Sequence, residues 1–203
     1  MASASVIQRP QYVKGLFVQH RIRLTALAFC AMLASEVLLG CVPRNPLQVA
    51  DPWVATGTAA LLLGLLLRSW AAGMLIKKKR LASDGPYALV RHPLYLGSIL
   101  LMLGFALLTG LWWNLPISAL IAIISFGTAI QSEERFLAEK FGDRWTAYAA
   151  DRGRLLPLGI AGNLAGFWDW KRWVRNREFN AWIGAAVGWV SLLAWFTVTS
   201  VSR

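Results

Sequence analysis

The chain has 203 residues, of which 57% are hydrophobic and 15% charged, with a formal net charge of +11 and a mean hydropathy of +0.50. This composition excludes an ordinary soluble domain and makes the lipid bilayer the expected environment. The positive charge then favours anionic lipid headgroups as its partner. It excludes nucleic acid, because no soluble reading domain remains to bind it.

Long apolar runs are the main feature of the chain, and each approaches the roughly 20 residues that a helix needs to cross a bilayer. We predict an all-α integral membrane protein with about five transmembrane helices and additional cytoplasmic interfacial helices. The short segment GLWWN between the third and fourth runs leaves room only for a tight helix hairpin. The predicted spans are residues 24–42, 53–76, 94–110, 115–131 and 180–200.

The basic residues are distributed unevenly around these spans. All but three of the 21 Lys and Arg residues lie in the N-terminal arm, the loop 77–91 or the segment 135–177; the exceptions are Arg44, Arg68 and Arg203. The positive-inside rule therefore places the N-terminus and these basic segments in the cytoplasm and the C-terminus outside. Because the chain is short, polytopic and without a eukaryotic sorting signal, we expect a bacterial inner membrane.

No polar linker divides the chain, so we treat it as a single membrane domain over 1–203. Cys30 and Cys41 fall on one predicted helix about 16 Å apart, which is too far for a disulfide. No Cys/His spacing predicts a metal site. The domain has three parts, which are the arm and first two spans (1–76), the hairpin with its flanking segments (77–157) and the interfacial segment with the last span (158–203).

The two ends of the hairpin carry the polar residues that need an explanation. The third span begins after Arg91 and His92, with Pro93 in its first turn, where a missing N–H costs nothing. The fourth span ends at Glu133 and Glu134, and an antiparallel hairpin brings the two ends together. Carboxylates there can bind an ammonium or hydroxyls, and Arg91 with the helix amides can bind a carboxylate. The sequence thus predicts a polar cytoplasmic site, to which Tyr87 and Tyr95 also belong.

Two further features flank this site. Residues 132–157 carry Phe136, Phe141, Trp145 and Tyr148 at near-helical spacing, which predicts an amphipathic helix on the membrane surface. Arg68 lies inside the second apolar run about two turns from the cytoplasmic KKKR. A charge at that depth is costly unless it is paired, which makes Arg68 a candidate functional residue; the alternative is that its side chain reaches the interface.

Ordered motifs in this region resemble one known group of enzymes. SDGPYALVRHPLYLG, followed some 35 residues later by EERFLAEKFGDRWTAY, is similar to the signature of the isoprenylcysteine carboxyl methyltransferases and phospholipid methyltransferases. LRSWA at 67–71 also resembles a segment that those enzymes carry, and the resemblance covers roughly residues 60–157.

The resemblance implies an integral membrane methyltransferase that uses S-adenosylmethionine, with a lipophilic substrate entering from the bilayer. By the same resemblance Glu134 is the cofactor-binding acid, and Arg91 belongs to the R-H-P-x-Y motif. Glu133 and Arg68 are the candidate catalytic residues, and no metal is expected. The remaining cofactor-binding residues that the resemblance implies are Lys79, Arg80, Leu81, Ala82, Tyr87, His92, Pro93, Leu94 and Tyr95.

The chain departs from the carboxyl-methylating members at one point. Those members share an arginine about one helical turn before the glutamates, and at this place the chain has Ile130, Gln131 and Ser132. A carboxylate without a cation is costly to desolvate, so a carboxylate acceptor needs Arg68 or an arginine of KRWVRNRE in its place. An amine or hydroxyl acceptor needs a proton acceptor instead, for which Glu133 or Glu134 is available.

Two other functions are compatible with parts of the pattern. Membrane sterol reductases, which use NADPH, share a similar arginine–histidine motif and late aromatic motif, but have a different pair where this chain has two glutamates. A non-catalytic membrane subunit or small transporter would keep the hairpin for structure alone. Broken helices at symmetric positions would favour transport, and the sequence shows none. The methyl acceptor and the oligomeric state are not determined by the sequence.

Overall fold

The computed structural model describes residue 31 and residues 34–76, 80–160 and 162–201, and all of its named elements are helical. Of the predicted first span, residues 31 and 34–38 are helical and residues 39–42 form a turn and an irregular segment, whereas 24–30, 32 and 33 lie outside the described residues. The named elements are α2 (Pro52–Met74), the 3-10 helix η1 (Gly85–Ala88), α3 (Pro93–Thr109), α4 (Asn114–Phe141), α5 (Asp143–Ala150), α6 (Trp170–Arg175) and α7 (Phe179–Val201).

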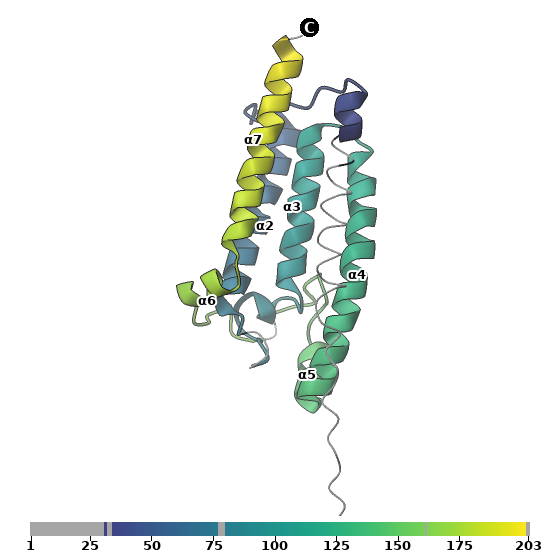
Figure 1. Cartoon of the computed structure of the whole chain (residues 1–203). Helices are drawn as coiled ribbons and strands as arrows, with labels where there is room; N and C mark the ends of the chain where they lie inside the picture. Colours follow the sequence, from purple (N-terminus) through teal and green to yellow (C-terminus); the bar gives the residue numbers. More distant parts are fainter. Residues whose placement is uncertain (1–30, 32–33, 77–79, 161, 202–203) are drawn as a thin grey trace, which may run out of the picture.

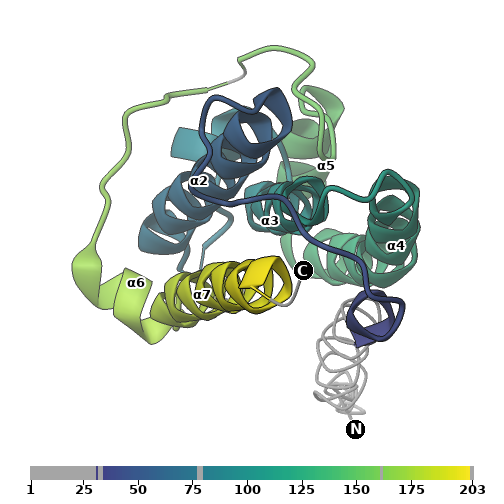
Figure 2. The same ribbon diagram turned by 90° about the horizontal axis from the view of Figure 1, so that it is seen from above.

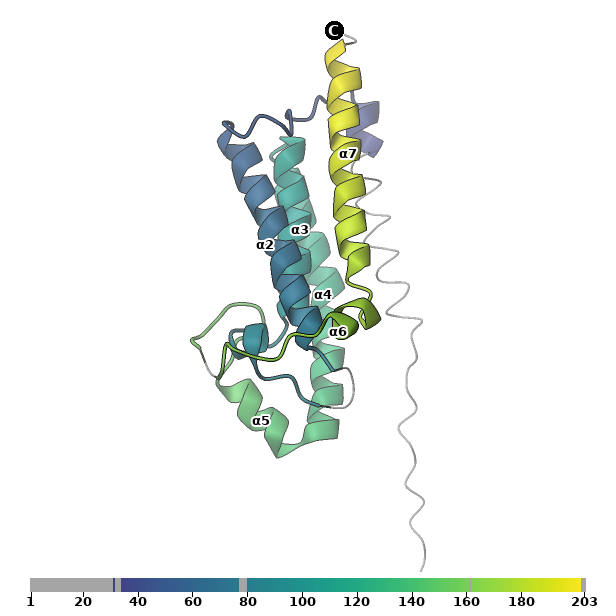
Figure 3. The ribbon, with the colours of Figure 1, turned by 90° about the vertical axis from the view of Figure 1, so that its left-hand side faces the viewer.

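Four long helices lie side by side, with the short helices α5 and α6 at one end and the C-terminus at the other (Figures 1 and 3). Figure 2 shows α3 in the middle of this group, and α3 contacts α2, α4 and α7. Three of the described helices, α2, α4 and α7, are long and apolar enough to cross a membrane, whereas α3 is apolar but has 17 residues. Exposed apolar side chains such as Leu63, Ile123 and Val187 suit a lipid environment.

Local sequence signals explain most helix ends. Asp51 caps α2 by accepting a hydrogen bond from the Trp53 amide at 2.8 Å, and Pro52 occupies the first position. Helix α3 begins at Pro93 and ends before Gly110, whose φ of 78° is accessible to glycine. Helix α4 likewise ends before Gly142, with φ 52°.

The end of α4 corrects one prediction. The fourth span was expected to stop at 131 and the glutamates to close it, but the helix runs without interruption to Phe141. Residues 132–141 are good helix formers and contain neither Gly nor Pro, so nothing ends the helix before Gly142. Glu133 and Glu134 therefore project from the middle of a continuous helix, and the separate amphipathic helix is only α5, Asp143–Ala150.

Helices α2 and α3 approach each other at two pairs of glycines. A β-carbon at Gly64 would lie 2.7 Å from the Gly97 carbonyl oxygen, and one at Gly57 would lie 2.9 Å from the Gly104 carbonyl oxygen. Small residues at such positions allow backbones in a membrane to approach closely and pack well. This contact fixes the start of α3, where His92 lies, relative to α2.

The last turn of α2 is completed by residues far along the chain. The Asn176 side-chain amide donates to the Ala72 carbonyl at 2.7 Å and to the Leu75 carbonyl at 3.1 Å. The Asp169 amide donates to the Gly73 carbonyl at 3.0 Å. A helix leaves its last four carbonyls without partners, and the segment around α6 supplies donors for them. The C-terminal helix α7 is thereby attached to the first half of the fold.

Candidate active site

The Glu134 carboxylate binds three side chains from two other segments. It accepts hydrogen bonds from Arg91 Nη1 at 2.8 Å and from Arg154 Nε at 3.1 Å. Its Oε2 also lies 2.8 Å from Arg154 Nη2 in an ion pair, and its Oε1 lies 3.2 Å from His92 Nε2. We call these four residues the Glu134 cluster. Its members Arg91, His92 and Glu134 were predicted to meet from the hairpin geometry, and the structure brings them together.

Arg154 reaches the cluster because two loops pair with each other. Residues 90 and 153 form an isolated parallel bridge, in which the Arg91 amide donates to the Gly153 carbonyl at 2.8 Å. The His92 amide then donates to the Arg154 carbonyl at 3.1 Å. No local pattern marks this pairing, because Arg154 is one of several basic residues in an irregular segment, and its place in the site was missed.

The short helix η1 contains a buried tyrosine, Tyr87. The Tyr148 hydroxyl donates to the Tyr87 carbonyl at 3.0 Å, and the Arg152 guanidinium lies 4.5 Å from the Tyr148 ring centre. The Tyr87 hydroxyl itself is buried and has no hydrogen-bond partner among the described residues. Burial raises the pKa of Tyr87 well above 10, and the negative charge of Glu133 adds to that rise. Tyr87 is therefore a neutral phenol that can donate to a ligand.

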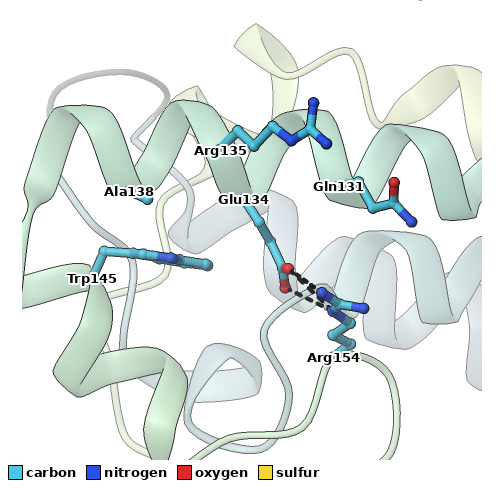
Figure 4. Close-up of a pocket in the computed structure, with 6 residues that line it drawn as sticks. All are labelled: Gln131, Glu134, Arg135, Ala138, Trp145 and Arg154. Carbon is cyan, nitrogen blue, oxygen red and sulfur yellow. Dashed lines mark hydrogen bonds and ion pairs between the residues drawn. The ribbon is translucent and has the colours of Figure 1, made fainter.

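A cavity of about 410 Å³ lies next to the Glu134 cluster. Figure 4 shows the Glu134 carboxylate pointing from α4 to Arg154, with the Trp145 side chain on the other side of Glu134. Small-molecule sites typically occupy about 300–1,000 Å³, so the cavity has the size of such a site. It is lined by Gln131, Glu134, Arg135, Ala138, Trp145 and Arg154.

Arg68 belongs to a second charged pair. Its Nε and Nη2 atoms donate to the two carboxylate oxygens of Glu178 at 2.8 and 3.0 Å, and the Glu178 side chain is only 3% exposed. Its Nη1 atom donates to Ser98 Oγ at 2.5 Å and to the Leu94 carbonyl at 3.3 Å. The intramembrane arginine flagged in the sequence is thus paired, and its partner Glu178 was not predicted.

The other predicted residues lie around these two groups. Arg80 is exposed and pairs with Asp84 at 3.4 Å, and Leu81 and Ala82 are half-buried. The Tyr95 ring lies 5.7 Å from the His92 ring and 5.5 Å from the Phe126 ring, between ring centres. Pro93 is buried at the start of α3, Glu133 is exposed on α4, and Lys79 lies outside the described residues.

Burial lowers the pKa of His92 below 6.5, although the negative charge of Glu133 and the hydrogen bond to Glu134 oppose this effect. His92 is therefore neutral at pH 7, with Nε2–H donating to Glu134. The unfolded chain takes up the proton near pH 6.5 and the folded chain only at lower pH, so we expect the free energy of unfolding to fall as the pH drops below 6.5. Unfolding in detergent at several pH values would measure this slope.

The matched variants are His92→Gln and His20→Gln, which replace the two histidines of the chain one at a time. The slope just below pH 6.5 should be shallower in His92→Gln than in His20→Gln. An unchanged slope in His92→Gln would contradict the assignment of this pH dependence to His92.

Comparison with known proteins supports the resemblance seen in the motifs. Residues 53–144 match the model of the phospholipid methyltransferase family. The chain is 36% identical over 84 residues to a protein-S-isoprenylcysteine O-methyltransferase of Schizosaccharomyces pombe, covering 41% of this chain and 34% of that protein. No solved structure matches the chain.

Two relatives carry names of a different kind. A cobalt-zinc-cadmium resistance protein, CzcN, of Cupriavidus metallidurans is 30% identical over 132 residues, which cover 63% of this chain and 59% of that protein. A nickel-cobalt-cadmium resistance protein, NccN, of Alcaligenes xylosoxydans is 25% identical over 142 residues, or 66% of this chain and 64% of that protein. The matched part spans less than two thirds of the length of each of the three relatives.

The family match covers α3, α4 and all of α2 except Pro52, and therefore the positions of Arg68, His92 and Glu134. Among the described residues, no group of three or more His, Cys, Asp and Glu side chains is arranged to hold a metal ion. The protein is an integral membrane protein with three candidate spans among its described residues, and its region 53–144 is similar to the phospholipid methyltransferase family.

Proposed function

We propose that the protein is an S-adenosylmethionine-dependent methyltransferase that acts on a lipophilic acceptor from the bilayer. The observation that carries this proposal is the Glu134 cluster beside a cavity of about 410 Å³. The cluster contains the histidine and the acid that the family resemblance assigns to the cofactor. The family match over 53–144 supports the same reaction.

The polar groups of the site fit this cofactor, which carries an ammonium, a carboxylate and ribose hydroxyls. Glu134 would hold the ammonium or the hydroxyls, and Arg91 would hold the carboxylate. Arg91 Nε and Tyr87 Oη are buried without hydrogen-bond partners among the described residues, so both can donate to a polar ligand. When bound, the cofactor supplies an electrophilic methyl group on a sulfonium.

The residues of the chain would act mainly by alignment and by excluding water. A neutral His92 and a neutral Tyr87 place no positive charge of their own next to a sulfonium. Glu133, which is exposed on α4, would accept the proton of an amine or hydroxyl acceptor. Arg68 enters the proposal as the anchor of α7, because its guanidinium already binds Glu178 and Ser98.

The proposal includes a topology of five spans with the N-terminus and the active site in the cytoplasm of a bacterium. Its support is the distribution of basic residues, since α5 and α6 lie at the same end of the helix group in Figure 1 and both belong to the basic segment 135–177. The Glu134 cluster contains Arg154 of the same segment and Arg91 of the basic loop 77–91.

Calorimetric titration of the detergent-purified protein with S-adenosylmethionine tests the function. We expect micromolar binding by the wild type and a loss of roughly tenfold to hundredfold in Glu134→Gln, because a charge-assisted hydrogen bond is removed. Glu139→Gln, which changes an exposed glutamate of the same helix, should bind like the wild type.

Two results would overturn the proposal. A folded wild type that binds NADPH and not S-adenosylmethionine would favour the reductase alternative. A folded wild type that binds neither would leave a non-catalytic role. Transfer of a tritiated methyl group to extracted membrane lipids would complete the positive case.

A further inference from the structure

A second cavity runs between α3 and α4 and meets the first. It has a volume of about 300 Å³ and is lined by apolar side chains from both helices, including Ile99, Leu103, Ile123 and Phe126. We call it the α3–α4 groove. Gln131 and Arg154 are its polar residues, and these same two residues also line the cavity beside Glu134. A polar site and an apolar groove therefore join at one pair of side chains.

The α3–α4 groove is suited to a hydrocarbon tail. Ile123 on its rim is 70% exposed, on a helix long and apolar enough to cross a membrane, so the groove opens toward the region that lipid tails occupy. Gly127 also lines it, and a β-carbon there would meet no atom within 4 Å. The space beside Gly127 is thus available to a ligand.

The charge at the junction is positive. Arg154 uses Nε and Nη2 to bind Glu134, while its Nη1 has no partner within the described part of the chain and its side chain is 55% exposed. Arg91 also binds Glu134, and Arg135 lines the same cavity. An anionic group entering from the groove would therefore meet an arginine with a free donor, which offsets the cost of removing that group from water.

We propose, on the basis of the methyltransferase function above, that Arg154 and Gln131 select the methyl acceptor as an amphiphile with an anionic head and one apolar tail. The tail lies in the α3–α4 groove, and the head, a carboxylate or a phosphate, accepts hydrogen bonds from Arg154 Nη1 and the Gln131 amide. Arg154 thus supplies, from a loop 20 residues beyond Glu134, the cation that helix α4 lacks at 131.

The reaction balances without a base. An oxygen of the anionic head forms a bond to the methyl carbon while the carbon–sulfur bond breaks, and the bonding pair stays on sulfur. The sulfonium becomes a neutral thioether and the head becomes a methyl ester with one negative charge fewer. No proton is released, and the weaker attraction of the product to Arg154 favours its departure.

Binding of four probes with the same twelve-carbon chain tests the proposal, by native mass spectrometry of the protein released from micelles. The probes are dodecanoate, dodecyl phosphate, dodecylamine and dodecanol. We expect the two anionic probes to bind at least tenfold more tightly than the amine and the alcohol. Arg154→Gln should abolish this preference, Arg154→Lys should restore part of it, and Gln131→Leu should weaken it. Arg144→Gln, at an exposed arginine of α5 outside both cavities, should preserve it.

The tail is tested by a matched pair of glycine substitutions. Gly127→Leu fills the α3–α4 groove and should weaken all four probes about tenfold, whereas Gly184→Leu on α7, where a side chain also meets open space, should not. Any of three results would overturn the proposal. The wild type could bind the amine or the alcohol more tightly than the anionic probes, or Arg144→Gln could change the preference as much as Arg154→Gln does. Gly127→Leu could also bind all four probes as tightly as the wild type.

The probe experiment and the cofactor experiment fail separately. If S-adenosylmethionine does not bind but the pattern of the probes holds, the acceptor site stands and the methyltransferase function is wrong. If the cofactor binds and the pattern of the probes fails, the methyltransferase function stands and the proposed acceptor site is wrong. Methyl transfer to dodecanoate or to dodecyl phosphate then shows which anionic head the site uses.

Discussion

Glu178→Ala should lower the free energy of unfolding by about 3–5 kcal/mol, because removal of one partner leaves the other charge buried and unpaired. The Glu178 side chain is 3% exposed and binds Arg68 through both carboxylate oxygens. Loss of the carboxylate would also release the start of α7 from α2. Unfolding of the protein in mixed micelles titrated with SDS, followed by circular dichroism, would measure the change.

The double variant Arg68→Met, Glu178→Leu serves as the control. It removes both charges and fills the space with apolar atoms, so it should recover most of the stability that Glu178→Ala loses. If Glu178→Ala is as stable as the wild type, or if the double variant is less stable than the single one, the pair does not hold α7 to α2 as described.

Gly97→Leu should cost at least about 1–3 kcal/mol of stability, the usual range for overpacking a close contact. A β-carbon at Gly97 would lie 2.8 Å from the Gly64 carbonyl oxygen and 2.5 Å from Arg68 Cγ, so α2 and α3 would have to separate. We expect binding of S-adenosylmethionine to fall as well, because α3 begins at His92 and Pro93. Thermal unfolding and calorimetry of one detergent preparation would measure both effects.

Gly184→Leu makes the same chemical change in α7, where a β-carbon meets no atom within 4 Å. It should leave unfolding and cofactor binding near the wild-type values. A Gly97→Leu protein that unfolds like Gly184→Leu would show that α2 and α3 are not in contact at this pair of glycines.

The sequence predicts the described long helices well. The runs 53–76, 94–110 and 180–200 correspond to α2, α3 and α7 to within two residues at each end. Long apolar runs are a strong signal, and Pro, Gly and Asp at their ends act through local backbone chemistry. The end of α4 was missed because its residues change from apolar to polar ten residues before the helix stops, and polarity alone does not end a helix.

The site could be predicted only where local geometry determines it. Arg91, His92 and Glu134 meet because a short hairpin places the start of one helix beside the next. Arg154 and Glu178 were missed because their contacts depend on how loops fold back over distances of 20 and 110 residues. No periodic pattern marks such contacts. Arg68 was found because an unpaired charge in an apolar run costs free energy. That cost indicates that Arg68 has a partner, but it does not identify the partner residue.

The contact between α2 and α6 has a consequence for the order in which the chain folds during synthesis. The carbonyls of Ala72, Gly73 and Leu75 receive their donors from Asp169 and Asn176. About a hundred residues must leave the ribosome after α2 before these donors exist, so the end of α2 stays incomplete while the hairpin is inserted. In a nascent chain truncated before Asp169, the carbonyls at the end of α2 should therefore lack these donors, and α2, α3 and α4 should be more sensitive to membrane proteases. Synthesis of the remaining residues through α7 should end this sensitivity.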